Sequence, residues 1–371
     1  MQRPLPIPPR DDAMQQDDID LHEPPAEVEE AGPAFGDPRA VVVRWRVPEG
    51  TAPTRADVYL TQKVRRLSRA RAQRIIANGD FRTPAGPLKP SSKLGRGDAV
   101  ELWRIPPDED LPEAAPPGVL FEDDDLLVLD KPGDLAVHPS ARYLHRTVTA
   151  WLRRYAGGGR SANPCHRLDR ETSGVLVCAK SKAAESAVKR AFADGGVQKR
   201  YLAVVRGRLE DARVALPLAL QGERGLVRIR MIHDEEGLES LTLARGLHYD
   251  EETDRTLVLA EPKTGRQHQI RAHLSLIDHP IVGDKLYAMG DAFFDAFTRT
   301  GVPEGGGGLE HVRHALHAYE AAFSLDGREL AFRAPLPAEL AELLPSFPGT
   351  GLHRELSSGE ALAFQVVGES S

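Results

Sequence analysis

The stretch that decides the fold is "HRLDRETSGVLV", residues 166–177. It places one carboxylate, Asp169, between Arg167 and Arg170, and an apolar run typical of a buried strand follows a sharp turn at Gly174. Loops carried by a rigid sheet often hold catalytic groups. Because neighbouring guanidiniums favour the charged form of a carboxylate, Asp169 suits a nucleophile or base and not a general acid. A surface salt bridge is the alternative interpretation of this pattern.

The sequence on both sides of this stretch predicts further strands and helices. Strands are predicted within 124–139, where the strand runs into a Lys-Pro turn, and at 199–207, 256–262 and 329–335. Helices are predicted at 147–159 and, with Ser181 as N-cap, at 181–196. Strands outnumber helices and few neighbours form βαβ units. This pattern predicts an α+β fold with a mixed, mainly antiparallel sheet over residues 119–345.

Charge divides the chain into distinct regions. Residues 1–40 hold ten acidic residues and three arginines, a net charge of −7 that equals the −7 of the whole chain. Residues 1–38 are therefore predicted to be a disordered acidic tail, 105–118 a Pro-rich linker and 346–371 a C-terminal tail. Residues 55–104 carry twelve Lys or Arg against four Asp or Glu, a net charge of +8. This excess predicts a polyanionic partner for a small domain at 39–104.

The basic segment contains a short helix with both ends marked. Ser68 is a good N-cap, Gly79 is the expected stop, and Arg71 and Arg74 share one face of the helix. The segment resembles the small α+β RNA-binding domain of ribosomal protein S-four in "LSRARAQRIIANGDF" and in "LGRGDAVEL". It departs from that domain at "FRTPAGPLKP", which lacks the usual short turn. The resemblance implies that Arg71 and Arg74 bind RNA.

Several classes of protein are not supported by the motifs. No Gly-rich phosphate loop, HExxH or Ser-His-Asp pattern is present, so neither a metal nor a cofactor is predicted. His166, His273 and His317 are interpreted as structural histidines, and Cys165 and Cys178 as small core residues that suit a reducing cytoplasm. No apolar stretch is long enough to span a membrane.

Five motifs in order resemble the RluA type of RNA pseudouridine synthase. They are "DLLVLDKPGDLAVHP", "HRLDRETSGVLV", "KRYLAVVRG", "TGRQHQIRAHLSLIDHPIVGD" and "RHALHA". The resemblance as a whole covers about 220 residues. Two departures lie away from the predicted reacting group. Gly133 stands one place earlier than the family's glycine, and the His-Pro common before the last strand is missing from "FSLDGREL".

The resemblance implies isomerisation of uridine to pseudouridine in RNA without a cofactor. Asp169 would be the nucleophile, attacking either the anomeric carbon or the uracil ring. Arg271 would be its ion-pair partner, and Tyr201 would stack on the flipped-out uracil. Arg167 would fill the gap that the base leaves, and Leu274 is assigned with it to substrate binding. Loop or bulge uridines are the expected targets.

The expected partner is structured RNA, with 23S ribosomal RNA or its assembly intermediates favoured and transfer RNA left open. A cytoplasmic monomer is expected. Two other functions remain as alternatives. One is a non-catalytic RNA-binding or ribosome-assembly factor built from the same parts. The other is a glycoside or nucleoside hydrolase, which needs a second carboxylate; Glu171, beside Arg170, is a poor candidate.

Overall fold

The computed structural model describes residues 34–36, 40–64, 67–104, 115–139, 146–156, 161–301, 304–348 and 365–367. The chain divides into a smaller unit, Met1–Pro112 with His138–His145, and a larger unit, Glu113–Val137 with Arg146–Ser371. Most of the predicted acidic tail, linker and C-terminal tail lies outside the described residues.

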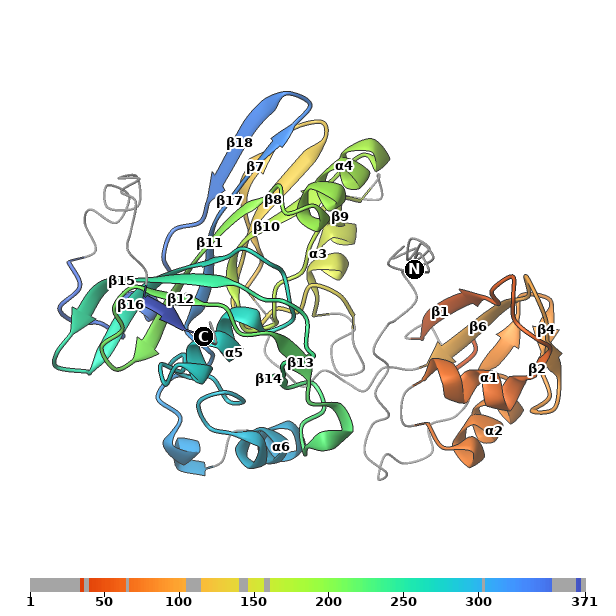
Figure 1. Cartoon of the computed structure of the whole chain (residues 1–371). Helices are drawn as coiled ribbons and strands as arrows, with labels where there is room; N and C mark the ends of the chain where they lie inside the picture. Colours follow the sequence, from red (N-terminus) through yellow and green to blue (C-terminus); the bar gives the residue numbers. More distant parts are fainter. Residues whose placement is uncertain are drawn as a thin grey trace, which may run out of the picture. The chain divides into compact units, whose positions relative to one another are not determined.

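The smaller unit is a four-stranded antiparallel sheet in the order β1-β6-β3-β4, with two helices and a short β2–β5 ladder (Figure 1). Its elements are β1 Val41–Arg46, β2 Thr54–Arg55, α1 Ala56–Lys63, α2 Arg69–Ala77, β3 Phe81–Thr83, β4 Gly86–Pro87, β5 Lys93–Leu94 and β6 Ala99–Arg104. The predicted helix ends are confirmed. Ser68 Oγ accepts a hydrogen bond from the backbone N–H of Arg71, and Gly79 has a φ of 83° just after the helix.

A buried carboxylate organises the basic side chains of this unit. Asp57 is fully buried at the start of α1 and accepts hydrogen bonds from Arg55, Arg69 and Gln73. Arg69 occupies the first turn of α2, where the helix dipole disfavours a cation. The ion pair with Asp57 offsets this local penalty.

The larger unit is built on an 11-stranded sheet whose main order is β19-β12-β15-β16-β11-β17-β10-β8-β7, with β18 beside β17 and β9 beside β10. Its strands are β7 Gly118–Glu122, β8 Leu126–Lys131, β9 Asn163–Pro164, β10 Ser173–Ala179, β11 Gln198–Arg206, β12 Ala212–Val214, β15 Thr242–Asp250, β16 Arg255–Pro262, β17 Leu316–Leu325, β18 Arg328–Arg333 and β19 Gln365–Val367. The β10–β17 and β12–β19 pairs are parallel and the other pairs are antiparallel. The predicted α+β fold with a mixed, mainly antiparallel sheet is confirmed.

Further short elements complete this unit. They are helices α3 Val148–Tyr155, α4 Lys182–Ala193, α5 Gln269–Leu276, α6 Asp291–Thr300 and α7 Ala338–Ala341, turns η1 Gly222–Arg224 and η2 Glu304–Gly308, and the hairpin β13 Leu218–Leu220 with β14 Met231–His233. The capping serine of the predicted helix at 181–196 is confirmed, because Ser181 Oγ accepts a hydrogen bond from the N–H of Ala184.

Helices cover both faces of the sheet around β8 and β10, which lie side by side in Figure 1. Leu126 and Val128 of β8 pack in one core with α4, whereas Leu127 and Leu129 pack in another core with α3. Successive strand residues point to opposite faces, so a strand that is covered on both faces reads as a continuous apolar run. This arrangement explains the uninterrupted "LLVL" and "GVLVC" segments.

Gly174 has a different role from the one predicted. Instead of a turn before the strand, it lies inside β10, paired with Lys131 on one side and Ala318 on the other. Its φ is 108°, and a Cβ at this position would lie 2.2 Å from the carbonyl oxygen of Ala318. Close approach of β17 and a left-handed φ therefore both require glycine here.

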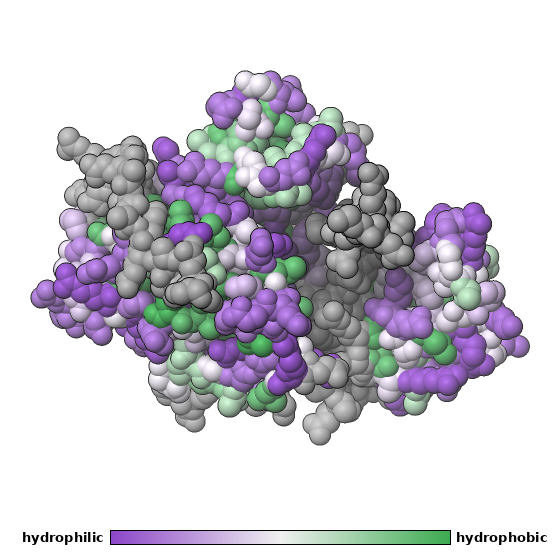
Figure 2. All heavy atoms as spheres, in the orientation of Figure 1, coloured by the Kyte–Doolittle hydropathy of each residue, from purple (hydrophilic) through white to green (hydrophobic). Residues whose placement is uncertain are grey.

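Figure 2 shows one face of the molecule, on which hydrophobic residues lie in separate patches between hydrophilic ones. No helix in the described part of the chain is long and apolar enough to cross a membrane.

Candidate active site

Asp169 lies in the loop between β9 and β10 and is held there by Arg271 of α5. The Nη1 of Arg271 donates a hydrogen bond of 2.6 Å to Oδ2 of Asp169, across 102 residues of sequence. The backbone N–H of Thr172 donates to the carbonyl oxygen of Asp169 and closes a tight turn. The Asp169 side chain remains 28% exposed, so a ligand can reach it.

Arg271 is fixed from its other side by a second carboxylate that the sequence analysis did not single out. Asp284 is fully buried and accepts from Nε of Arg271 at 2.7 Å and from Nη2 at 3.0 Å. It also accepts the backbone N–H groups of Leu286 and Tyr287. Bidentate pairs of this kind fix the plane of a guanidinium. The one sequence signal for Asp284 is an acid directly after the apolar run "PIVG".

The charges around Asp169 keep it ionised. Burial alone raises the pKa of Asp169, but His268 when protonated, and Arg271, outweigh burial and bring that pKa to about 2. Burial lowers the pKa of His268 to about 4, so this ring is neutral at pH 7. At neutral pH the ion pair with Arg271 is therefore the main stabilisation of the carboxylate.

The two arginines that flank Asp169 in sequence have other positions. Arg170 forms ion pairs with Asp134 and Glu171. Arg167 is exposed and adds a smaller lowering of the pKa of Asp169. The sequence pattern thus indicated the charge state, but the direct ion-pair partner comes from α5.

Buried side chains from three other segments fix the loop that carries Asp169. Lys131 is fully buried at the end of β8 and donates to the carbonyl oxygens of Pro132, Leu135 and Arg170. Lys285 donates to both carboxylate oxygens of Glu171 at 3.0 Å.

Arg313 reaches the same loop through its guanidinium, which donates to the backbone oxygen of Glu171. Its side chain also covers Gly133, where a Cβ would lie 2.6 Å from it. Glu171 is thus engaged in the structure of the loop, which agrees with its poor standing as a general acid.

Tyr201 stands on β11 beside this loop. It is opposite Ala318 on one side and Ala260 on the other. Burial, and then the negative charge of Asp169, raise the pKa of Tyr201 above its usual value, so its hydroxyl is protonated at neutral pH. A neutral tyrosine next to an ionised aspartate can donate a hydrogen bond or stack on a base.

His268 and Tyr287 complete the surroundings of Asp169. His268 has a left-handed φ of 51° at the start of α5, and its Nε2 lies 3.8 Å from Oδ2 of Asp169. Its Nδ1 lies 3.2 Å from the hydroxyl of Tyr287. The guanidinium carbon of Arg271 lies 5.1 Å from the centroid of the Tyr287 ring, within the range of a cation–π interaction.

Other predicted residues lie elsewhere. Leu274 is fully buried in the core that includes β11 and β16, so its placement does not support substrate binding and we correct it to a packing residue. Arg74 is exposed and Arg71 half-buried on α2 of the smaller unit.

The histidines and cysteines that were interpreted as structural are hydrogen-bonded to protein groups or buried. His166, His273 and His317 each form hydrogen bonds with protein groups, among them Val177 N–H, Thr242 Oγ1 and Ser173 Oγ respectively. Cys165 and Cys178 are buried free thiols. Among the residues that the structure describes, no group of three or more His, Cys, Asp or Glu could hold a metal ion.

The resemblance predicted a mixed sheet with an ionised aspartate that pairs with an arginine and lies beside a tyrosine. Asp169, Arg271 and Tyr201 have this arrangement. The sequence profile of the RNA pseudouridylate synthases matches residues 125–276. The chain is 34% identical to ribosomal large subunit pseudouridine synthase D of Nitrosomonas europaea, over 81% of this chain and 87% of that protein. It is 33% identical to ribosomal large subunit pseudouridine synthase C of Vibrio cholerae, over 80% of this chain and 94% of that protein.

A solved structure also indicates this family. Human RNA pseudouridylate synthase domain containing 4 aligns with 62% of this chain and 92% of its own, at a TM-score of 0.50 and 26% identity. The chain belongs to the RNA pseudouridylate synthase family. It is an RNA pseudouridine synthase, an isomerase that rebuilds the link between uracil and ribose in RNA.

Proposed function

We propose that this enzyme isomerises uridines of large-subunit ribosomal RNA, with Asp169 as its nucleophile. The relatives from Nitrosomonas europaea and Vibrio cholerae are named as synthases of the ribosomal large subunit, which supports this substrate class. The observation that carries the proposal for the site is the guanidinium of Arg271, which is shared between Asp169 and the buried Asp284.

The geometry suggests which oxygen of Asp169 reacts. Oδ2 accepts the hydrogen bond from Arg271, whereas Oδ1 has no hydrogen-bond partner among the described residues. Oδ1 is thus the oxygen that attacks, at the anomeric carbon or at the uracil ring. Arg271 neutralises the carboxylate until the attack and holds it in one orientation. After the glycosidic bond breaks, the uracil rotates and bonds to ribose through carbon, so no group is gained or lost.

Tyr201 and Arg167 would handle the base itself. We propose that the ring of Tyr201 stacks on the flipped uracil and that its neutral hydroxyl relays a proton during rotation. Arg167 is exposed two residues before Asp169, and its guanidinium would fill the gap left in the RNA. Uridines in loops and bulges suit this mechanism because flipping a paired base costs a few kcal/mol.

The smaller unit would hold the RNA through its phosphates. The proposal that it is related to the RNA-binding domain of ribosomal protein S-four rests on the sequence resemblance, on the net charge of +8 over residues 55–104 and on the helix pair that begins at Ala56. Arg71 and Arg74 would contribute phosphate contacts. We propose a monomer that acts on 23S ribosomal RNA in the cytoplasm, with 39–104 as the RNA-binding domain and 119–345 as the catalytic domain.

One assay tests the function directly. An unmodified transcript of large-subunit ribosomal RNA, labelled with tritium at C5 of its uridines, is incubated with the protein. Formation of pseudouridine releases the label, because the new carbon–carbon bond replaces the C5–H bond. Release of free uracil would instead indicate a hydrolase, and binding without release of tritium would indicate an assembly factor.

A further inference from the structure

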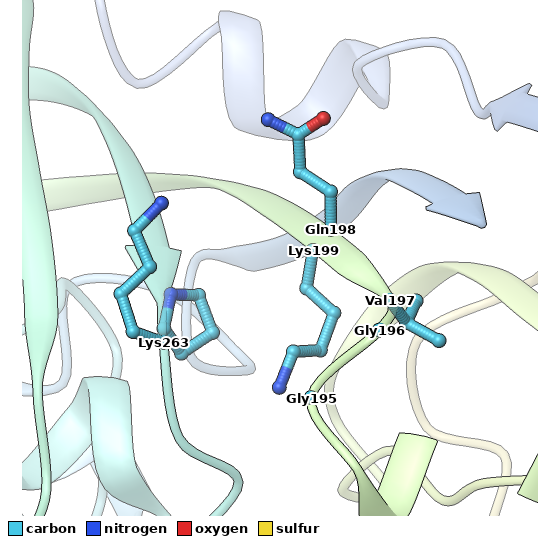
Figure 3. Close-up of a pocket in the computed structure, with 7 residues that line it drawn as sticks. Gly195, Gly196, Val197, Gln198, Lys199 and Lys263 are labelled. Atoms are coloured by element: carbon cyan, nitrogen blue, oxygen red, sulfur yellow. The ribbon is translucent and has the colours of Figure 1, made fainter. Parts of the chain in front are cut away.

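A cavity lined by two lysines lies at the start of β11 and the end of β16. It has a volume of about 350 Å³ and is lined by residues 195–199 together with Pro262 and Lys263. Figure 3 shows Lys199 and Lys263 from two neighbouring strand ends at this cavity, with Gln198 pointing away from Lys199. Nothing in the reaction proposed above uses these lysines.

Lys199 is a cation without an acidic partner among the described residues. Its Nζ donates only to the carbonyl oxygen of Thr264, at 3.1 Å. Burial, and then the charge of Lys263, lower the pKa of Lys199. Lys263 is balanced by Glu261, whose carboxylate lies 2.6 Å from its Nζ. The positive charge of the cavity is therefore left uncompensated at Lys199.

Lys199 is near Tyr201 in the chain and contacts the loop that leads to His268. Lys199 stands two residues before Tyr201 on β11, about 6.6 Å along an extended strand. It is close enough to His166, three residues before Asp169, to lower the pKa of that ring. Thr264, which accepts its hydrogen bond, lies in the loop that leads to His268.

We propose that this cavity binds a phosphodiester of the RNA, belonging to a nucleotide next to the target uridine, and that Lys199 is the cation that holds it. An oxyanion would restore the balance of charge, since a partly desolvated ammonium gains more from an ion pair than an exposed one does. The volume admits a phosphate with part of its sugar. The site rests on the proposed action on RNA and adds one fixed point on the strand beside the reacting base.

The variants for the test separate charge from shape. Lys199→Met keeps a long unbranched side chain and removes the charge, and Lys199→Arg keeps the charge. Lys182→Met is the matched control. Lys182 is the first residue of α4, and its side chain is 84% exposed. It lies about 17 Å from the other end of that helix, which the cavity residues follow in sequence. Thermal unfolding of each variant establishes that the fold is retained.

The probe is a stem-loop transcript carrying a uridine that the parent enzyme converts, mapped first on the full ribosomal RNA. One phosphate contact to single-stranded RNA contributes roughly 0.7 to the salt slope of binding. Lys199→Met is expected to lose that amount, so a rise in salt from 50 to 200 mM weakens the parent about 2.6-fold more than the variant. Lys199→Arg and Lys182→Met are expected to match the parent.

Uncharged linkages identify the phosphate. A methylphosphonate placed in turn at each position flanking the uridine is expected to weaken binding to the parent at one position and to leave Lys199→Met unaffected there. If each linkage weakens both proteins alike, or the salt slopes agree, the site is disproved. A slower saturated rate with an unchanged slope would also disprove it, since Lys199 would then only support the Thr264 loop. If the parent converts no uridine, the proposed function fails, and the salt slopes of the parent and Lys199→Met on the full ribosomal RNA transcript still test Lys199.

Discussion

Asp284 holds Arg271 by two hydrogen bonds, from Nε at 2.7 Å and from Nη2 at 3.0 Å. The remaining nitrogen, Nη1, is thereby aimed at Asp169. Burial of the three charges is compensated because each carboxylate has a donor and the guanidinium has two acceptors. The ion pairs of Arg271 with Asp169 and Asp284 therefore explain how the partly buried Asp169 stays ionised and in one orientation.

Replacing the proposed nucleophile tests its role most directly. We expect Asp169→Asn to lower the single-turnover rate by at least ~10⁴-fold, the order of loss found when a covalent nucleophile is removed. RNA binding is expected to stay within about twofold, since phosphate contacts supply most of the affinity. Affinity and tritium release are measured on the same transcript. Turnover of the Asn variant above background would show that Asp169 is not the nucleophile.

The pH dependence tests the contribution of Arg271. The pKa of Asp169 is about 2, below its ordinary value, so Asp169 stays ionised as pH falls from 8 to 5. Protonation of Asp169 therefore does not lower the rate of the parent in this range. Arg271→Lys keeps the charge but cannot bind both carboxylates, so the pKa of Asp169 rises by part of the about 1 to 3 units that a neighbouring arginine contributes. The protonated form is inactive, so the variant loses rate as pH falls through the raised pKa.

Single-turnover rates between pH 4 and 8 measure this effect. We expect an added acid limb in Arg271→Lys below about pH 5. Arg206→Lys is a matched control, because Arg206 pairs with Glu310 outside the site. Parallel profiles for the parent and Arg271→Lys would contradict the assignment of Arg271 as the group that keeps Asp169 charged.

Local features of the fold could be predicted from residue patterns, whereas the ion pair of Asp169 with Arg271 was expected only from the family resemblance. The capping serines Ser68 and Ser181 are confirmed because a cap depends on residues three positions away. The charge on Asp169 was predicted from Arg167 and Arg170, but Arg170 turns to Asp134 and Glu171. No local pattern links Asp169 to Arg271, 102 residues later.

The misplacement of Leu274 has a similar cause. Ile270, Leu274 and Ile277 lie on one apolar face of α5, and that face packs into the core. A helical pattern shows which residues share a face and does not show whether a sheet or a ligand covers it. Asp284 was missed because a single carboxylate after an apolar run is not a recognisable motif. Its partner, Arg271 of α5, becomes evident only in the folded chain.

Gly174 gives a test of the strand pairing. We expect Gly174→Ala to destabilise the larger unit by about 3 kcal/mol or more, because the added Cβ would overlap the Ala318 carbonyl oxygen and the φ of 108° is unfavourable for alanine. Gly327→Ala is the control. Gly327 has a φ of 75° with no atom within 4 Å of an added Cβ, so only the left-handed conformation costs energy, roughly 1–2 kcal/mol.

The measurement must report on the larger unit alone. Changing Trp45 and Trp103 to Phe leaves Trp151, on α3, as the single tryptophan. Urea unfolding followed by Trp151 fluorescence then gives the free energy of unfolding of that unit. Equal losses for the two glycine variants would contradict the close contact between β10 and β17.

The proposed RNA-binding role of the smaller unit is tested through salt. We expect the double variant Arg71→Ala, Arg74→Ala to lower the salt slope of RNA binding by about 1 to 2 units, at roughly 0.7 for each contact to a single strand. The double variant Arg44→Ala, Arg96→Ala removes the same charge from the same unit. Those two side chains are 67% and 74% exposed and pair with Glu101 and Glu49. The same slope for both double variants would show that α2 does not meet the RNA.

Two substitutions of Tyr201 distinguish stacking of its ring from proton transfer by its hydroxyl. Phe keeps the aromatic plane, and stacking contributes about 1 to 3 kcal/mol per base, so Tyr201→Phe should bind RNA normally. Burial and the charge of Asp169 raise the pKa of Tyr201, so the hydroxyl at neutral pH is a proton donor and not a base. We expect Tyr201→Phe to turn over at least ~100-fold more slowly, the scale of a lost acid–base group. Tyr201→Leu should lose affinity as well. Single-turnover rates and affinities measured separately on one RNA decide the matter: a Phe variant as fast as the parent restricts Tyr201 to stacking.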